Sequence, residues 1–320
     1  MTWIVTGGAG YIGSHVARAF LADGIDVVVI DDLSSGRAGF VPHGAVLEQG
    51  SLVDAAFVDR VFAEHPATGV IHLAGFKYAG VSVSRPLHTY SQNVTATVNL
   101  LEAMQAAGVS SMVFSSSAAV YGTTPAAFVT EQTPTTPESP YGETKLIGEW
   151  MIADQARATG LRHTSLRYFN VVGSATPAVS DTSPHNLFPL VFRALLAGDT
   201  PKIFGDTYPT PDGTCVRDYV HVADVAAAHV AAARKLDARV PLDRAYNLGS
   251  GSGSSVREIM TEMAAVTGID FTPEVMPARP GDPARIVASG ERAARDVGWA
   301  PRHTLRDMIA SGWEAAIHTV

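Results

Sequence analysis

The sequence predicts an α/β fold, in which a doubly wound parallel sheet is joined by a smaller α/β domain. Through the first half of the chain, short apolar runs alternate with longer segments of helical periodicity, which is typical of βαβ units and a parallel sheet. At 320 residues the chain is also longer than the usual single domain, so we expect one large and one small domain.

Six apolar runs, each rich in Val, Ile or Phe, are expected to form buried parallel strands. They span residues 3–6, 26–31, 46–49, 69–74, 111–116 and 164–169. Helices are expected between them, and two of these end near Gly24 and Gly108, as glycine at a helix end favours. The helices span residues 11–22, 54–64, 89–107 and 141–158.

After Asn170 the pattern changes to loops rich in Pro, Ser and Asp around a single helix, and here we expect the smaller domain to begin. The loops lie at 174–184 and 206–213, and the helix at 187–197. A later helix and strand, at 220–235 and 246–249, return the chain to the first sheet. The predicted larger domain is therefore residues 1–170 and 214–250, interleaved with a smaller domain of residues 171–213 and 251–320.

Composition excludes several classes of function. The chain has 31 acidic and 23 basic side chains, a formal charge of −8 and no basic run, so nucleic acid is not an expected partner. Its one cysteine, Cys215, forms no internal disulfide and has no neighbours at metal-ligand spacing. The longest apolar stretches, such as 27–30, are too short to cross a bilayer, and the chain starts directly in a strand pattern. We expect a metal-free cytoplasmic protein without a membrane partner.

A glycine-rich turn follows the first predicted strand and opens the first predicted helix. Gly8, Gly10 and Gly13 fit one dinucleotide-binding spacing, and Gly7, Gly10 and Gly13 fit another. Either lets backbone N–H groups approach a pyrophosphate at a helix N-terminus. Asp31 ends the second strand, where its carboxylate would accept hydrogen bonds from the adenosine ribose and repel a 2′-phosphate. The turn therefore predicts an NAD site.

Tyr141 and Lys145 lie four residues apart, on one face of a predicted helix. A nearby ammonium and a nicotinamide cation would favour the phenolate, so Tyr141 could accept a hydroxyl proton. Ser117 lies at the end of the fifth strand, the edge at which doubly wound sheets place their ligands. We expect these three residues to form a catalytic group in which Ser117 orients the substrate oxygen.

These motifs resemble the extended short-chain dehydrogenase/reductase family, and within it the UDP-galactose 4-epimerases. The likeness covers nearly the whole chain, and the stretches 75–77, 82–87 and 212–222 are specific to sugar epimerases. The other matching stretches are 5–15, 114–122, 139–141 and 166–170. The resemblance implies a Rossmann domain, a tightly held NAD, a homodimer formed through the helices at 89–107 and 141–158, and reversible C4 inversion of UDP-galactose and UDP-glucose. In that reaction Tyr141 would move the proton of the 4-hydroxyl, and Lys145 would hold the nicotinamide ribose and keep the tyrosine acidic.

The resemblance also implies two sets of binding residues, which share Lys77 and Tyr141. Those on the NAD side are Gly7, Gly10, Tyr11, Ile12, Gly13, Asp31, Ser51, Leu52, Leu73, Ala74, Lys77, Asn93, Ser115, Tyr141, Lys145 and Tyr168. Those on the UDP-sugar side are Lys77, Ser117, Tyr141, Asn170, Asn186, Leu187, Arg217, Tyr219, Arg279 and Asp282. Arginine suits a diphosphate, although Arg279 and Asp282 could also form a surface ion pair.

The chain departs from the family pattern at the adenine and sugar ends. Ser51 stands where an aspartate near the adenine is usual, which predicts weaker retention of NAD, and the segment 34–45 is short. Ile286 falls where the family walls the sugar pocket, and its bulk favours glucose and galactose over N-acetylated sugars. If the alignment slips by one residue to Arg285, its cation would instead favour a carboxylate, and UDP-glucuronate becomes a candidate.

Three other functions compete with epimerisation. A nucleotide-sugar 4,6-dehydratase would carry Asp and Glu after the active-site hydroxyl, where this chain has Ala118 and Ala119. A regulatory protein that senses NAD without turnover would not need Tyr141, Lys145 and Ser117 together. A net oxidoreductase would need NAD in stoichiometric amounts. The histidines at 72, 221 and 229 have no partners at ligand spacing and are expected to be packed or exposed.

Overall fold

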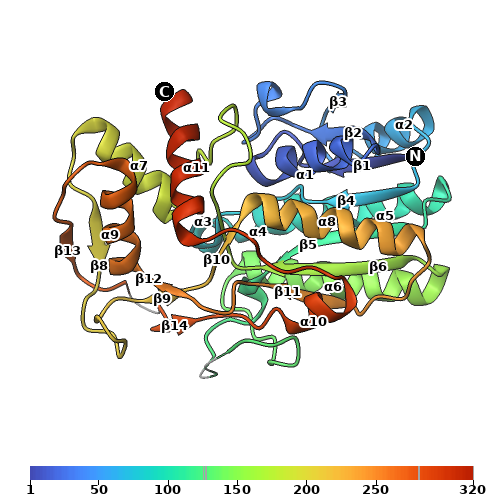
Figure 1. Ribbon diagram of the computed structural model, residues 1–320. Coiled ribbons are helices and arrows are strands. Elements are labelled where there is room, and N and C mark those ends of the chain that lie inside the picture. The colour runs from blue at the N-terminus through green and yellow to red at the C-terminus, as the bar shows by residue number, and fades with distance from the viewer. Residues whose placement is uncertain (125, 127, 280–281, 320) are drawn as a thin grey trace.

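The computed structural model describes residues 1–124, 126, 128–279 and 282–319, and it shows a large and a small α/β part side by side (Figure 1). The large part contains a seven-stranded parallel sheet with the order β11-β6-β5-β4-β1-β2-β3. These strands are β1 (Thr2–Thr6), β2 (Asp26–Asp31), β3 (Val46–Gln49), β4 (Gly69–His72), β5 (Ser111–Ser117), β6 (Arg162–Tyr168) and β11 (Ala245–Leu248). The predicted fold class, a doubly wound parallel sheet, is confirmed.

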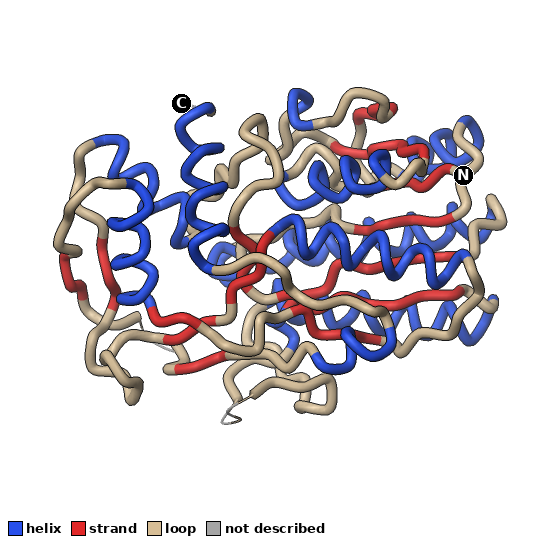
Figure 2. The backbone as a smooth tube through the Cα atoms, viewed as in Figure 1, coloured by secondary structure: helices blue, strands red, loops and turns tan. Residues whose placement is uncertain are grey.

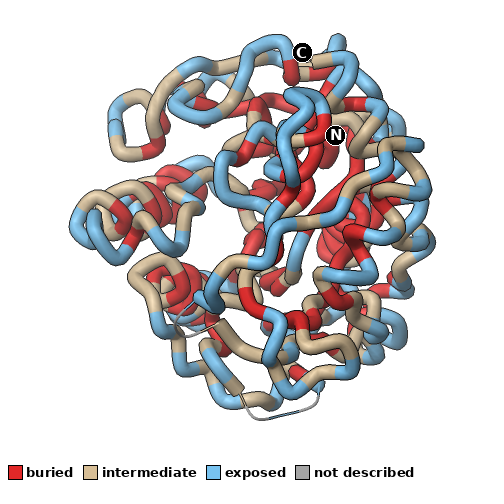
Figure 3. The backbone as a smooth tube through the Cα atoms, turned by 90° about the vertical axis from the view of Figure 1, so that its left-hand side faces the viewer, coloured by how far each residue is buried: buried red, intermediate tan, exposed pale blue. Residues whose placement is uncertain are grey.

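Helices cover both faces of this sheet because successive side chains of each strand point to opposite faces. Trp3 and Val5 of β1 pack with α1 (Tyr11–Ala22) and α8 (Val222–Asp237). Ile4, between them, packs with α2 (Ala55–Glu64), α5 (Ala96–Ala106) and α6 (Pro140–Thr159) on the other face. Figure 3 shows the buried segments mainly in the interior of the molecule and the exposed segments around its periphery.

The start of α6 is fixed by local sequence. Ser139 caps the helix by accepting a hydrogen bond from the Gly142 N–H at 3.2 Å, and Pro140 occupies the first turn, where its missing N–H costs nothing. At the other end, Gly160 takes the left-handed conformation that closes many helices. Tyr141 therefore lies in the first turn of α6, at the end that faces the sheet's carboxyl edge.

The helix predicted at 89–107 is interrupted. Residues Pro86–Tyr90 form α4, Ser91–Thr95 form a π-helical turn, η2, and α5 follows without a break. Asn93 lies in this turn, and a short additional helix, α3 (Ala79–Ser84), precedes it. Such π-helical turns often occur at functional sites, because they redirect one side chain of a continuous helix.

The small part contains short strands and three longer helices (Figure 2). Its helices α7 (Leu187–Ala197), α9 (Val256–Thr267) and α11 (Leu305–His318) enclose a core of their own that includes Phe192, Met260 and Ile309. The strands form the pairs β7 (Asn170–Val172) with β10 (Tyr219–His221) and β8 (Lys202–Phe204) with β13 (Glu274–Met276), and the sheet β12 (Ser254–Ser255), β9 (Val216–Arg217) and β14 (Arg285–Ile286). The remaining short turns are η1 (Ala38–Phe40) and η3 (Ala118–Val120).

The chain passes from the large part to the small part and back, since β11 joins the large sheet after α7 of the small part. The sequence-based division assigns all of residues 251–320 to the small domain, but residues 291–299, which contain α10 (Glu291–Asp296), pack on the large part, and α11 packs on the small one. Ala293, Val297 and Trp299 belong to the core beneath α8, and the Trp299 indole N–H donates to the Asp224 carbonyl at 2.7 Å. Among the described residues, no helix is both long enough and apolar enough to span a membrane.

Candidate active site

A continuous cleft of about 1840 Å³ runs along the carboxyl ends of the sheet strands and on between the two parts. It is larger than the roughly 300–1,000 Å³ usual for one drug-sized ligand, so it has room for two sizeable ligands side by side. Of the predicted binding residues, all but Asn93 and Ser115 line it. The segments that meet there come from the turn before α1, the ends of β2, β4, β5 and β6, and the strands and helices of the small part.

The glycine turn before α1 is closed too tightly for side chains. A Cβ on Gly13 would lie 2.1 Å from the Gly7 carbonyl oxygen, and one on Gly7, whose φ is +70°, would lie 2.8 Å from the Ala74 nitrogen. Gly8 instead packs on Val29 of β2, while Gly7, Gly10 and Gly13 line the cleft. Of the two spacings that the sequence allows, the cradle is therefore formed by glycines 7, 10 and 13, with the N-terminus of α1 behind them.

Asp31 lines the end of the cleft beside the glycine turn. Its carboxylate accepts hydrogen bonds from the Ala9 N–H at 3.0 Å and the Leu33 N–H at 2.8 Å, and so ties the loop after β2 to the glycine turn. Burial raises the pKa of Asp31, and these two hydrogen bonds oppose that rise. Ser51 lines the same end and accepts a hydrogen bond from the Val53 N–H at 3.3 Å. The side chain that replaces the family's aspartate is thus partly engaged with its own loop.

Asn93 and Ser115 lie behind the cleft wall and support residues that face the cleft. The Asn93 amide accepts from the Phe76 N–H at 2.6 Å and donates to the Phe76 carbonyl at 3.0 Å, which holds the loop that carries Lys77. The Ser115 carbonyl accepts from the Lys145 ammonium at 2.9 Å. Both predicted residues therefore act in this structure by positioning a neighbour.

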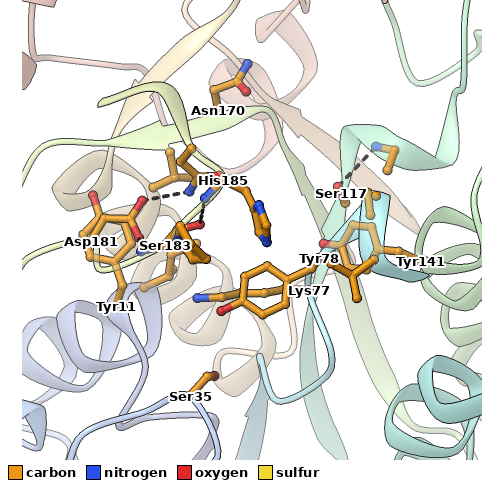
Figure 4. A pocket seen from close by; sticks show the side chains of 18 of the residues that line it. Tyr11, Ser35, Lys77, Tyr78, Ser117, Tyr141, Asn170, Asp181, Ser183 and His185 are labelled. Atoms are coloured by element: carbon orange, nitrogen blue, oxygen red, sulfur yellow. Dashed lines mark hydrogen bonds between the residues drawn. The ribbon is translucent and has the colours of Figure 1, made fainter. Parts of the chain in front are cut away.

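Tyr141, Lys145 and Ser117 meet where β5 ends against α6, as the sequence predicts. Figure 4 shows Ser117 and Tyr141 together at one side of the cleft. The Lys145 ammonium lies 5.9 Å from the centre of the Tyr141 ring and is itself buried. Three groups able to move or hold a proton thus share one wall of the cleft.

The charge state of this group differs from the expectation that Lys145 keeps the tyrosine acidic. Burial raises the pKa of Tyr141, and only the hydrogen bond with Ser117 opposes that rise. Burial also lowers the pKa of Lys145 to about 8, and Glu149 acts in the opposite direction. A Tyr141 phenolate near neutral pH therefore requires a further positive charge in the cleft.

Two arginines line the far end of the cleft, one in an ion pair and the other over an aromatic ring. Arg217 pairs with Asp282 at 2.6 Å, so the carboxylate is held in place, whereas the guanidinium of Arg279 lies over the Phe204 ring at 4.1 Å. The ion pair considered between Arg279 and Asp282 is therefore replaced by one with Arg217. Asn170 and Asn186 reach this end too, and their amides donate to the Asp218 carbonyl and to the Asp181 carboxylate, each at 2.8 Å.

The pairing of β14 with β9 determines which of two neighbouring side chains, Ile286 or Arg285, faces the cleft. The Ile286 side chain lines the cleft and packs against the cluster that includes Val120 and Leu146. Arg285, on the opposite side of the strand, is exposed, and its guanidinium lies 5.9 Å from the centre of the Phe128 ring. The wall of the pocket is thus apolar, and the slipped alignment that would favour a carboxylate sugar loses its support.

One contact that crosses the cleft could not be predicted from the sequence. Tyr78 follows the predicted Lys77, and His185 precedes the predicted Asn186, and their rings meet edge to face at 5.2 Å (Figure 4). The two loops belong to different parts of the molecule. The positions of Tyr78 and His185 beside predicted ligand residues could have indicated that each lies near the cleft. Their contact joins residues more than a hundred positions apart, so no local sequence pattern predicts it.

Comparison with known proteins places this geometry among nucleotide-sugar enzymes. Residues 3–249 match the NAD dependent epimerase/dehydratase family. The UDP-glucose 4-epimerase of Corynebacterium glutamicum is 43% identical over 317 residues, which cover 98% of this chain and 95% of that protein. The UDP-glucose 4-epimerase of Streptomyces lividans is also 43% identical, with the same coverage of both chains.

Solved structures agree with these relatives. A crystal structure of a UDP-glucose 4-epimerase superimposes with a TM-score of 0.95 and 40% identity, covering 98% of this chain and 97% of that one. The enzyme of Bifidobacterium longum, solved in complex with NAD⁺ and UDP, gives a TM-score of 0.90 with 36% identity and covers 99% and 98% of the two chains.

Proposed function

The chain belongs to the NAD-dependent epimerase/dehydratase family, and we propose that it interconverts UDP-galactose and UDP-glucose by inverting the configuration at C4. The observation that carries this proposal is the position of Tyr141, Lys145 and Ser117. They lie in one continuous cleft, between the glycine cradle at one end and the arginine-lined pocket at the other. A reacting sugar held by its UDP at the arginine end would therefore reach the tyrosine beside the cofactor.

The cradle fits NAD on three grounds of geometry. The spaces that a Cβ would fill at Gly7 and Gly13 are closed by backbone, which leaves the N–H groups at the start of α1 open to a pyrophosphate. Asp31 offers a carboxylate for ribose hydroxyls, and Leu52 and Leu73 provide apolar walls nearby. When bound, NAD supplies the hydride acceptor for C4 and a positive charge near Tyr141.

The chain's own residues move the proton and hold the substrate. Tyr141 accepts the proton of the 4-hydroxyl and later returns it, while Ser117 hydrogen-bonds the oxygen that becomes a carbonyl in the 4-keto sugar. Arg217 and Arg279 suit the two phosphates, and Asp282, held by Arg217, is oriented to accept bonds from ribose hydroxyls. With UDP fixed, the keto sugar can turn and present its other face, so that inversion occurs without net oxidation.

The pocket also separates this reaction from its rivals. Ala118 and Ala119 line the cleft beside Ser117, and their methyl groups supply neither the acid nor the base that a 4,6-dehydratase needs. Ile286 fills the wall where an N-acetyl group would extend, so glucose and galactose fit better than their N-acetylated forms. UDP-N-acetylhexosamines and UDP-glucuronate, which this apolar wall disfavours, are the alternative substrates to be tested beside UDP-galactose.

Proton NMR of UDP-galactose with the purified protein tests the function. We expect the anomeric signal of UDP-glucose to appear without added cofactor, and Tyr141→Phe to slow this by roughly 10²–10⁴-fold. If only added NAD starts the reaction, Ser51 and weak NAD retention account for it. If neither condition gives UDP-glucose, while another UDP-sugar is converted, the proposed substrate is wrong.

We further propose a homodimer in the cytoplasm. Trp150 on α6 is 58% exposed and Leu87 on α4 is 83% exposed, and large apolar side chains this exposed favour a partner surface. The free, buried thiol of Cys215 suits a reducing compartment. Light scattering should give twice the chain mass of 33.6 kDa for the wild type and the single mass for Trp150→Glu. A monomeric wild type would contradict the dimer.

A further inference from the structure

A buried carboxylate stands directly behind the proposed catalytic lysine. Tyr141, Lys145 and Glu149 are spaced by four residues, so α6 places all three along one face. The side chain of Glu149 is 10% exposed, and it forms a two-point ion pair with Arg167 of β6, at 2.8 Å and 2.5 Å. Glu149 does not line the cleft, and the mechanism above does not use it.

The end of β5 connects to each of these three helix positions. The Ser115 carbonyl accepts from Lys145 at 2.9 Å, and the Ser116 hydroxyl donates to Glu149 at 2.5 Å. The next serine, Ser117, lies close enough to Tyr141 for its hydroxyl to oppose the rise in the pKa of Tyr141. Three consecutive serines of one strand thus fix three successive turns of α6, and the lysine is held between a strand carbonyl and a carboxylate one turn away.

Few charged and titratable groups among the described residues surround Lys145 and Glu149. On β6, Arg167 faces Glu149 and donates its remaining N–H to the Tyr121 hydroxyl at 2.9 Å. Tyr121 in turn donates to Asn247 at 2.7 Å. His163, also on β6, and His72 on β4 lie close enough for their pKa values to respond to Glu149 and to Lys145, and burial lowers both. Burial lowers the pKa of Lys145, and the charge of the Glu149 carboxylate opposes this fall.

We propose that Glu149 is a positioning residue of the reaction, whose charge keeps Lys145 protonated and directed at the Ser115 carbonyl beside Tyr141. This inference rests on the proposed function, since Lys145 matters only if Tyr141 transfers a proton. With Glu149 present, burial lowers the pKa of Lys145 to about 8, so loss of the carboxylate would leave part of the lysine neutral near physiological pH. A neutral lysine would remove the ammonium that lies 5.9 Å from the centre of the Tyr141 ring and that would act on Tyr141 together with the charge of bound NAD.

The charge of Lys145 can be measured without turnover. Trace acetylation with acetic anhydride across a pH series, followed by mass spectrometry of the peptide that contains Lys145, reports its titration, with the exposed Lys202 as internal reference. Glu149→Gln should move the Lys145 midpoint to lower pH, because the attracting charge is gone. Arg167→Gln should move it to higher pH, because Glu149 then faces Lys145 without a competing cation.

The opposite signs separate this role from a structural one. A change that merely loosened the fold would shift the Lys145 midpoint in the same direction in both variants. Glu131→Gln is the matched control, since its carboxylate is also buried, with a side chain 5% exposed, but it pairs with Arg292 and accepts from the Asn247 N–H at 2.8 Å, away from Lys145. It should lower stability without moving the Lys145 midpoint.

Each result decides the proposal. The proposal is supported if the Lys145 midpoint shifts in opposite directions in the two variants and if the alkaline limb of the pH profile of kcat follows that midpoint. Shifts of one sign, or no shift, overturn it. If Glu149→Gln does not fold, Arg167→Lys, which keeps a cation beside Glu149, is measured with Arg167→Gln: a rise of the Lys145 midpoint in Arg167→Gln alone supports the proposal, and an equal rise in both variants overturns it. Failure of epimerase activity in the wild type would contradict the proposed function but leave the lysine titration readable, so the two failures are distinguishable.

Discussion

Tyr141, Lys145 and Ser117 show how burial sets the chemistry of a side chain. Each is placed by the end of β5 and the start of α6, yet burial shifts the pKa of Tyr141 and the pKa of Lys145 away from the charged forms that the reaction needs. The chain therefore holds a neutral tyrosine until positive charge enters the cleft. In the proposed reaction, this arrangement would make Tyr141 able to act as the base only when the cofactor is bound.

Ile286 makes a prediction about substrate choice. Ile286→Ser removes the apolar wall, and we expect the variant to gain turnover of UDP-N-acetylglucosamine while UDP-galactose turnover persists. Its packing against the Val120 and Leu146 cluster predicts a stability loss of about 1–3 kcal/mol. Ile286→Val keeps the wall and serves as the control. A serine variant that folds and gains no activity on the N-acetylated sugar would show that another residue sets the limit.

The roles of residues that belong to short sequence motifs could be predicted. The roles of residues that depend on contacts between distant parts of the chain could not. The glycine turn and the Tyr141–Lys145 spacing lie within a few positions of each other in the sequence. The Arg217–Asp282 ion pair joins residues 65 positions apart, so the sequence offered only the nearby Arg279 as an alternative partner for Asp282. Glu149 had a usable signal, because it lies one turn beyond Lys145, but only the fold reveals that Arg167 and Ser116 bury it.

Among the elements, the turn between β1 and α1 is the most constrained. Gly13→Ala would place a Cβ 2.1 Å from the Gly7 carbonyl oxygen, so the backbone of the turn would have to move to make room for it. We expect a stability loss of about 1–3 kcal/mol, and NAD affinity lower by roughly tenfold or more, measured by calorimetry. Gly39→Ala, where no atom lies within 4 Å, is the matched control. Equal NAD affinity in both variants would contradict the cradle.

Element boundaries were predictable where caps or periodicity are strong. The first helix and the one at 187–197 match α1 and α7, and α6 differs by one residue at each end. The π-helical turn at Ser91–Thr95 has no breaker in its sequence and arises where Asn93 reaches Phe76 and Thr144. The strands of the small part, some of only two residues, are too short for a periodic signal.

Over the whole molecule, buried histidines tie stability to pH. Burial lowers the pKa values of His15, His221 and His229 to about 4 and that of His72 to about 3, below the value of 6.5 in the unfolded chain. The unfolded state thus binds more protons below pH 6.5, so stability is full above that pH and falls as the pH drops towards 4. We expect up to about 2 kcal/mol lost per histidine by pH 5.

Urea unfolding measured between pH 7.5 and pH 5 checks this expectation. The free energy of unfolding should fall steadily below pH 6.5, and His72→Gln, whose ring bonds Thr6 and Thr97, should flatten the fall. His43→Gln changes an exposed histidine and should leave the slope unchanged. A wild-type stability that is constant down to pH 5 would mean that these histidines charge without unfolding the chain.

In the proposed reaction, C4 is oxidised and reduced again within one cleft, without release of the hydride. The most direct test is proton NMR of the UDP-glucose formed from UDP-galactose that carries deuterium at C4, in ordinary water. Deuterium should stay at C4 of the product, because the hydrogen that leaves returns to the same carbon. A product with a protium signal at H4 would show exchange with solvent and would contradict the account.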